Sequence, residues 1–203
     1  MISAYQIKPR FQQLLRPVLG VLHKAGVSAN AITWTAILLS AATGLLLWLY
    51  PNGHMLWVFA VALLVRMALN ALDGMMARMH DMKSVGGEML NELGDVLSDA
   101  VMYFPLVKLP GVTPGWVLWF IFLALLNEFI GVLTRAATGV RRYDGPMGKS
   151  DRALVLGLTC LLFFFWPAVM VSFDYIFAAM SVLLVVSSIA RVRGGLLPGA
   201  SDR

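Results

Sequence analysis

Apolar residues dominate this chain in six long stretches, which polar residues separate. The stretches cover residues 31–50, 54–78, 86–107, 115–138, 153–172 and 174–190. A bilayer core of roughly 30 Å needs about 20 apolar residues of helix to cross it, and a spanning segment must satisfy its own backbone hydrogen bonds. The pattern therefore predicts an all-α integral membrane protein with six transmembrane helices.

A different pattern precedes the first stretch. Residues 5–24, YQIKPRFQQLLRPVLGVLHK, alternate apolar positions with lysine, arginine and glutamine. This alternation predicts an amphipathic helix that lies along the cytoplasmic membrane interface, broken or kinked at Pro9 and Pro17, with a solvated arm as the alternative. After it, Ser28 or Asn30 can cap the first span.

The absence of a repeat or a long linker predicts one domain over residues 1–203. Its expected parts are an interfacial arm (1–26), a six-helix bundle (31–190) and a cytoplasmic tail (191–203). The composition agrees with a membrane protein, because 59% of the 203 residues are apolar and only 13% are charged.

The net charge of +5 is concentrated on one side of the predicted membrane. Lysines and arginines occupy the N-terminal arm, the connections after the second and fourth spans, and the tail, whereas the opposite connections hold only Lys108. The positive-inside rule then places both termini in the cytoplasm. Such a face favours anionic lipid headgroups and phosphate-bearing substrates. Nucleic acid is a poor alternative, since no basic soluble module is present to read it.

Residues 70–99 hold six of the chain's eleven acidic residues. On the second span, a stripe at spacings of three and four places these side chains on one face: Arg66, Asn70, Asp73, Gly74 and Ala77. On the third span, a stripe at spacings of four contains Gly87, Asn91, Asp95 and Asp99. A short turn joins the two spans, so we expect the stripes to face each other near the cytoplasmic surface. The small residues Gly74, Ala77, Gly87 and Gly94 would let these two helices approach closely.

The two stripes bring together side-chain oxygens from Asn70, Asp73, Asn91 and Asp95. This set suits a hard cation such as Mg²⁺ or Mn²⁺, and the nearby Arg78 points to a phosphate-bearing substrate. A packed polar network that ties two helices together is the alternative interpretation. Deeper in the bilayer, Arg66 needs a carboxylate partner; we expect Asp99, with Glu128 on the fourth span as the rival.

A second basic group lies in the connection 138–153, at the start of the fifth span. Arg141, Arg142 and Lys149 stand there beside a helix N-terminus, which favours an anionic ligand. A topology signal alone would produce much the same pattern. Both interpretations stay open at this point.

The motif residues resemble those of the CDP-alcohol phosphatidyltransferase family. That family carries the pattern Asp-x2-Asp-Gly-x2-Ala-Arg-x8-Gly-x3-Asp-x3-Asp. Every fixed spacing is matched here, by Asn70, Asp73, Gly74, Ala77, Arg78, Gly87, Asn91 and Asp95. Two aspartates of the pattern are therefore asparagines. The six-span layout, the interfacial helix and the Asn30 and Thr33 pair are also similar, and the chain resembles an enterobacterial inner-membrane branch of the family.

The resemblance implies a reaction and a set of roles. A CDP-linked lipid, usually CDP-diacylglycerol, donates its phosphatidyl group to an alcohol, phosphorylated or not, and CMP leaves. Two Mg²⁺ or Mn²⁺ ions would bind at Asn70, Asp73, Asn91 and Asp95, and Asp95 would take the proton from the attacking hydroxyl. Nucleotide and diphosphate would bind at Asn30, Thr33, Gly74, Ala77 and Arg78. A homodimer in a bacterial inner membrane, with a cytoplasmic active site, is also implied.

Asn70 and Asn91 lower the negative charge of the expected metal site. Glu88, Glu92 and Asp99 flank the third-span stripe and are candidates for additional ligands. A non-catalytic lipid- or nucleotide-binding membrane protein, whose metal site has decayed, is an alternative function. A small transporter is another.

Overall fold

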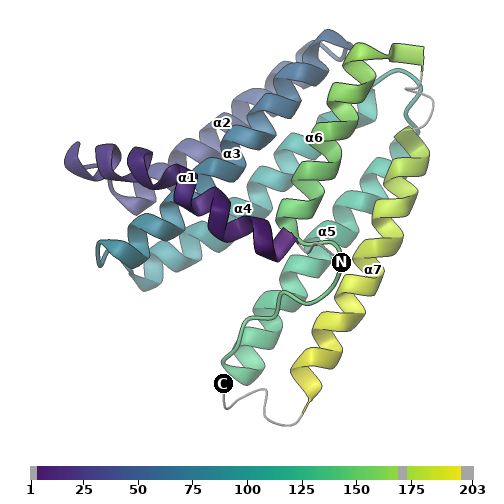
Figure 1. Cartoon of the computed structure of the whole chain (residues 1–203). Helices are drawn as coiled ribbons and strands as arrows, with labels where there is room; N and C mark the ends of the chain where they lie inside the picture. The colour runs from purple at the N-terminus through teal and green to yellow at the C-terminus, as the bar shows by residue number, and fades with distance from the viewer. Residues whose placement is uncertain (1–3, 169–172, 198–203) are drawn as a thin grey trace.

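The computed structural model describes residues 4–168 and 173–197, with side chains from residue 9 onward. Helices make up nearly all of this part (Figure 1). They are α1 (Ala4–Lys24), α2 (Ala29–Leu49), α3 (His54–Met79), α4 (Val85–Tyr103), η1 (Phe104–Lys108), α5 (Pro114–Thr138), α6 (Lys149–Phe165) and α7 (Phe173–Leu196). The expected tail (191–203) is thus helical as far as Leu196, and residues 198–203 lie outside the described residues.

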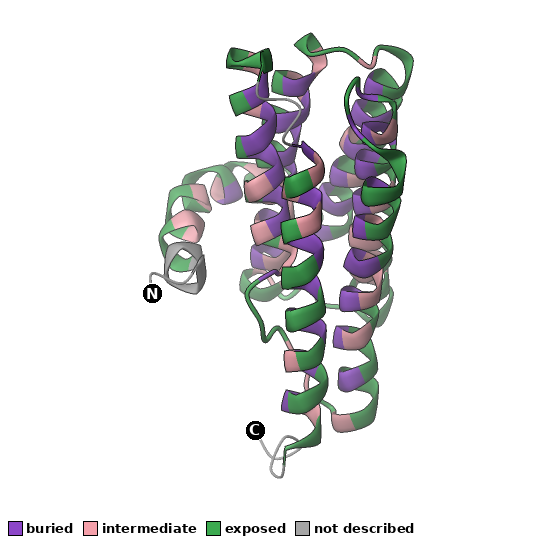
Figure 2. Cartoon of the chain, turned by 90° about the vertical axis from the view of Figure 1, so that its right-hand side faces the viewer, coloured by how far each residue is buried: buried purple, intermediate pink, exposed green. Residues whose placement is uncertain are grey.

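Four helices are long and apolar enough to cross a bilayer, namely α2, α3, α5 and α7. Helices also occupy the other two predicted windows, but α4 carries four acidic residues and α6 has only 17 residues, of which three in its first turn are charged. The last residues of the 153–172 window, 169–172, lie outside the described part. Six spans therefore stay a prediction. Figure 2 shows buried positions turned between the helices and exposed positions along the outside of the bundle.

The helix α1 lies across the bundle rather than along it (Figure 1). It continues through Pro9 and Pro17 as one element, so the helix is not broken at either proline, and a kink there stays a prediction. Its C-terminal half packs on α2 and α3, where Leu19 joins a buried cluster with Ile32 and Met76. Ser28 caps α2 by accepting a hydrogen bond from the backbone N–H of Ala31 at 3.2 Å, as the sequence predicts. That α1 lies at the membrane interface stays a prediction.

The close helix approach in the bundle involves α2 and α4, not α3 and α4. A Cβ on Gly94 would come within 2.7 Å of the Ile37 side chain on α2, and one on Gly44 would collide with the carbonyl of Val101 on α4. The prediction that Gly94 serves the approach of the second and third spans is therefore wrong. Helix α2 packs against both α3 and α4. Helices α3 and α4 contact each other through polar side chains, as in the Asn70–Asp95 hydrogen bond and the Arg66–Asp99 ion pair.

Charged side chains occupy the centre of the bundle. Asp99 of α4 is 3% exposed and lies 2.6 Å from Arg66 of α3 and 2.7 Å from Arg152 of α6. Arg152 also contacts Glu128 of α5 at 3.2 Å. The predicted Arg66–Asp99 pair is confirmed, and the rival Glu128 pairs with Arg152 instead. This network, Arg66, Asp99, Arg152 and Glu128, links the four helices α3, α4, α5 and α6.

Substitution of Asp99 tests the structural role of this network. Asp99→Asn removes the negative charge that pairs with the buried guanidinium groups of Arg66 and Arg152. Breaking a buried ion pair destabilises a protein by about 3–5 kcal/mol. We expect a large loss of membrane expression and a lower thermal unfolding temperature in detergent. The matched control is Glu88→Gln on the same helix, whose partner Arg135 is exposed, and we expect it to behave as the parent protein does. Normal stability of Asp99→Asn together with a selective loss of metal affinity would make Asp99 a metal ligand instead.

Candidate active site

The motif residues gather at one end of the bundle. Helix α2 begins there, α3 ends there, and α4 and α6 begin there, so Asn30, Arg78, Gly87 and Lys149 come from four helix ends. The opposite end contains Lys108, whose ammonium donates to the carbonyl of Trp48 at 2.9 Å. The predicted clustering of the two stripes at one surface of the bundle is thus present in the fold.

Asp95 stands at the centre of this cluster. Its Oδ1 accepts a hydrogen bond from the amide of Asn70 at 2.9 Å, and its Oδ2 pairs with the ammonium of Lys149. Its backbone carbonyl accepts from the guanidinium of Arg66 at 3.2 Å. Helices α3 and α6 therefore each hold one oxygen of the Asp95 carboxylate, in a half-buried position.

Asp73 provides a second carboxylate on the α3 side. It is 2% exposed, and its Oδ2 accepts a hydrogen bond from the hydroxyl of Thr33 at 3.1 Å. Its Oδ1 is buried with no hydrogen-bond partner among the described residues. Asp73 also lies within electrostatic reach of Asp95 and Lys149. A buried carboxylate oxygen without a donor is costly, so its place in the cluster calls for a cationic or donor partner.

The glycines of the motif make room for polar groups. A Cβ on Gly74 would stand 3.1 Å from the guanidinium of Arg78, which folds back over it. A Cβ on Gly87 would stand 2.8 Å from the amide oxygen of Asn30, so Asn30 lies against the start of α4. Ala77 packs toward the buried cluster around Leu19. The structure thus brings Asn30, Gly74, Arg78 and Gly87 to the site, with Ala77 behind them.

A small polar hollow of about 200 Å³ lies between α1 and the end of α3. Arg78 lines it together with Gln12 and Arg16 of α1. The sequence placed α1 only as an interfacial arm. Its polar face therefore adds hydrogen-bond donors next to the motif arginine, which the spacing of the motif does not reveal.

The three basic residues predicted as one cluster do not stay together. Lys149 reaches Asp95, whereas Arg141 lies between Glu92 and Glu128, at 2.9 Å from the latter. Arg142 pairs with Asp144 of its own loop at 2.8 Å and lies against Gly194 of α7. Partial burial lowers the pKa of Arg141 from its ordinary value. Of the three, only Lys149 contacts a motif carboxylate.

The three acids proposed as additional metal ligands all have arginine partners. Glu88 pairs with the exposed Arg135 at 2.8 Å, Glu92 pairs with Arg141, and Asp99 belongs to the buried network. Arginines, rather than the cluster formed by Asp73 and Asp95, therefore engage these three carboxylates. Compensation for the two asparagines does not come from these side chains in this arrangement.

The remaining oxygen donors fit a hard divalent cation. Asp73 and Asp95 supply carboxylates, Asn70 and Asn91 supply amide oxygens, and Asn91 stands one turn before Asp95 on the same face of α4. Three or more His, Cys, Asp or Glu side chains do not gather at any one place in the described ranges. The buried Oδ1 of Asp73 is the observation that supports a cation here, with a weaker ligand charge than four carboxylates would give.

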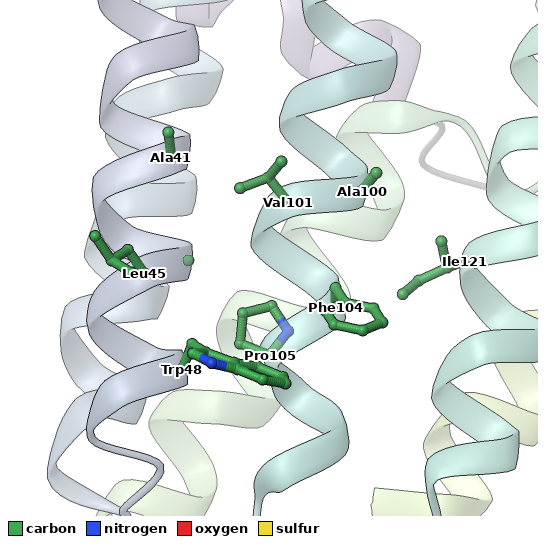
Figure 3. Close-up of a pocket in the computed structure, with 9 residues that line it drawn as sticks. Ala41, Leu45, Trp48, Ala100, Val101, Phe104, Pro105 and Ile121 are labelled. Carbon is green, nitrogen blue, oxygen red and sulfur yellow. The ribbon is translucent and has the colours of Figure 1, made fainter.

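An apolar pocket of about 440 Å³ lies deeper along the helices that carry the site (Figure 3). Leu45 and Trp48 of α2, Val101 of α4 and Phe104 of η1 line it, with Ile121 on the side of α5. Its walls are almost entirely hydrocarbon. The chain thus combines a polar site at one end of the bundle with an apolar recess between the same two helices, α2 and α4.

Sequence reasoning missed the residues on the far side of Asp95. Arg152 and Arg191 are 0% and 1% exposed, and Glu128 of α5 contacts both, at 3.2 Å and 3.7 Å. Arg191 also donates to the backbone carbonyl of Asn127. A signal was available only at Glu128, because a charged residue inside an apolar span needs a partner of opposite charge, whereas Arg152 and Arg191 lie just outside the predicted spans. The sequence does not say which helices supply the partners.

Comparisons with known proteins agree with this arrangement. The family model described as CDP-alcohol phosphatidyltransferase matches residues 26–189. The chain is 44% identical over 199 residues to inner membrane protein YnbA of Escherichia coli (strain K12), covering 98% of this chain and 99% of that protein.

Two solved structures have a similar fold. One is phosphatidylinositol phosphate synthase (PgsA1) of Mycobacterium tuberculosis with CDP-DAG bound, with a TM-score of 0.77 at 21% identity over 94% of this chain and 98% of that one. The other is the same synthase with manganese and citrate, with a TM-score of 0.73 at 22% identity over 92% and 91%. The two structures show a common fold, and the family model, which spans most of the chain, settles the class of the protein. The chain belongs to the CDP-alcohol phosphatidyltransferase family and is a membrane transferase of that class.

Proposed function

We propose that this enzyme transfers a phosphatidyl or related substituted phosphate group from a CDP-linked lipid, such as CDP-diacylglycerol, to an alcohol, with release of CMP. The observation that carries this proposal is the Asp95 carboxylate, whose two oxygens contact Asn70 and Lys149 next to the buried Asp73. The donor bound to one synthase of similar fold, CDP-DAG, supports the choice of donor. The apolar pocket between α2 and α4 has a lining that suits an acyl chain.

The chemistry follows from positions around Asp95. The acceptor hydroxyl attacks the phosphorus that bears the lipid, Asp95 takes the hydroxyl proton, and the bond from that phosphorus to the CMP oxygen breaks. Asn70 and Lys149 fix the orientation of the carboxylate. Asn30, Thr33, Gly74 and Arg78 line the side on which nucleotide and diphosphate would bind. In such transfers, most of the rate enhancement comes from positioning the reacting groups and from neutralising the charge of the transition state.

Mg²⁺ or Mn²⁺, two ions by resemblance, would be held by Asn70, Asp73, Asn91 and Asp95. A cation there would neutralise the diphosphate charge and assist departure of CMP. The manganese in a complex of the similar synthase supports this assignment. Two carboxylates instead of four give weak binding by the protein alone, so we expect the diphosphate of the donor to strengthen cation binding reciprocally.

The orientation in the membrane follows from charge. The site end of the bundle carries Arg78, Arg135, Arg141, Lys149 and Arg191, whereas the opposite end carries Lys108. We therefore propose that this end and both termini face the cytoplasm of a bacterial inner membrane, with α1 along the interface and all six helices, α2 to α7, spanning it. The homodimer stays a prediction from family resemblance.

CMP release from CDP-diacylglycerol is the direct test. The purified protein with Mg²⁺ or Mn²⁺ and a panel of alcohols should release CMP, and EDTA should stop the release. Asp95→Ala should lower kcat by about 10²–10⁴-fold, as for loss of a general base. Glu88→Gln, which removes a carboxylate from the surface of the same helix, should keep parental activity. An Asp95→Ala variant as active as the parent would refute the role of Asp95, and absence of CMP with every alcohol would refute the transfer itself.

The asparagines allow a test of cation binding without turnover. Asn91→Asp adds a carboxylate beside Asp95, so Mn²⁺ affinity measured calorimetrically without donor should rise by about tenfold. Asn70→Asp should differ, because it replaces the amide that donates to Asp95 with a second negative charge. We expect it to lower thermal stability in EDTA and to regain stability when Mn²⁺ is added. Unchanged Mn²⁺ affinity in Asn91→Asp would exclude Asn91 from the cation site.

A further inference from the structure

The basic residues of the connection before α6 and of its first turn, Arg141, Arg142 and Lys149, are paired with carboxylates. Arg141 contacts two of them, Glu92 of α4 and Glu128 of α5. Lys149 contacts Asp95, and Arg142 contacts Asp144. The residues whose charge suggested an anionic acceptor in the sequence are therefore neutralised by partners from other helices and from their own loop.

The layer beneath is also paired, although its three arginines, Arg66, Arg152 and Arg191, share only two carboxylates. Glu128 contacts Arg141, Arg152 and Arg191 with its two oxygens, and Arg152 shares Asp99 with Arg66. Arg152 is fully buried, so its charge depends on these carboxylates. Release of either carboxylate to admit another anion would leave it buried and unpaired. Arg152 therefore does not supply a free cation for an incoming phosphate.

The ion pair between Glu92 and Arg141 lies close to Asp95, the proposed proton acceptor. It precedes Asp95 by three residues on α4, so the two side chains share one face of the helix. The side chain of Glu92 is 26% exposed and that of Arg141 is 14% exposed, so both border the open side of the cluster. A phosphate group bound at Arg141 would meet the carboxylates of Glu92 and Glu128, and like charges at such contact repel strongly in a partly buried site.

Hydroxyl groups meet no such penalty. A hydroxyl can donate to a carboxylate such as Glu92 and accept from a guanidinium. The Nε of Arg141 is buried without a hydrogen-bond partner in the part of the chain that is described, and remains a donor. The paired charges thus form a surface with both donors and acceptors but little net charge for an anion to meet.

We propose that the acceptor of this enzyme is an uncharged polyhydroxyl alcohol rather than its phosphate ester, and that Glu92 and Glu128 set this preference by neutralising Arg141. The inference rests on the proposed transfer reaction. It assigns the two glutamates as specificity residues, because neither belongs to the motif that binds donor and cation.

Matched acceptor pairs test the preference. The full-length protein in nanodiscs, with CDP-diacylglycerol and Mn²⁺, is offered glycerol against glycerol 3-phosphate and inositol against inositol 1-phosphate. We expect the uncharged member to have the higher kcat/KM by about tenfold or more in each pair that is used. A higher kcat/KM for the phosphorylated members would overturn the inference and leave the transfer reaction standing.

Glu92→Gln tests the assigned residue. The substitution removes one of the two carboxylates that pair with Arg141. The ratio of kcat/KM for the phosphorylated acceptor to kcat/KM for the uncharged acceptor should therefore rise by about tenfold. Glu88→Gln stands four residues earlier on α4 and pairs with an exposed arginine, so its ratio should equal the parent's. Equal ratios in all three proteins would overturn the role of Glu92.

A binding measurement separates this inference from the transfer reaction. Thermal unfolding of the three proteins is followed with glycerol 3-phosphate added and without donor. Glycerol 3-phosphate should raise the unfolding temperature of Glu92→Gln more than that of the parent or of Glu88→Gln. This expectation does not depend on whether CMP release is observed. Equal stabilisation of the parent and of Glu92→Gln would overturn the inference, even in a protein without turnover.

Discussion

The bundle depends on the charge of Asp99 being shared between two arginines. A carboxylate at this depth is tolerable only when its partners are already buried with it, and Arg66 of α3 and Arg152 of α6 are both buried against Asp99. The same contacts orient the turn of α4 that carries Asp95, because Arg66 also binds the carbonyl of Asp95. The ion pairs that hold the helices together therefore also fix the position of the proposed proton acceptor.

This arrangement gives the site two sides with different chemistry. Helices α2 and α3 approach from one side with Thr33, Asp73 and the folded-back Arg78. Helices α5, α6 and α7 approach from the other with alternating acids and arginines. Asp95 belongs to both sides, since its two oxygens contact α3 and α6. A residue that takes a proton from an acceptor beside a bound donor needs such a place between them.

The sequence predicts the α2–α3 side well and the other side poorly, for a physical reason. Spacings of three and four place Asp73 and Asp95 on helix faces, and the short turn between α3 and α4 puts both residues at the same end of the bundle, so local rules are sufficient for the polar cluster. The partners of Arg141 and Arg152 come from α4 and α5, across intervals that no periodicity encodes. The helix contact was misassigned for the same reason, since Gly94 is on the expected face of α4 but the neighbour that fills that face is α2.

The contacts of Asp95 suggest a role for Asn70, one of the two asparagines at motif positions. An aspartate at position 70 would set a second negative charge against Oδ1 of Asp95, whereas the amide of Asn70 donates a hydrogen bond to it. Asp95 can therefore be held in place by neutral and cationic side chains of the protein itself. Compared with the family pattern, negative charge is lower where donor and cation would bind, while Glu92 and Glu128 place it around the arginines on the acceptor side. The reduced charge at Asn70 and Asn91 therefore bears on cation binding, whereas the pairing of Arg141 with Glu92 and Glu128 bears on the choice of acceptor.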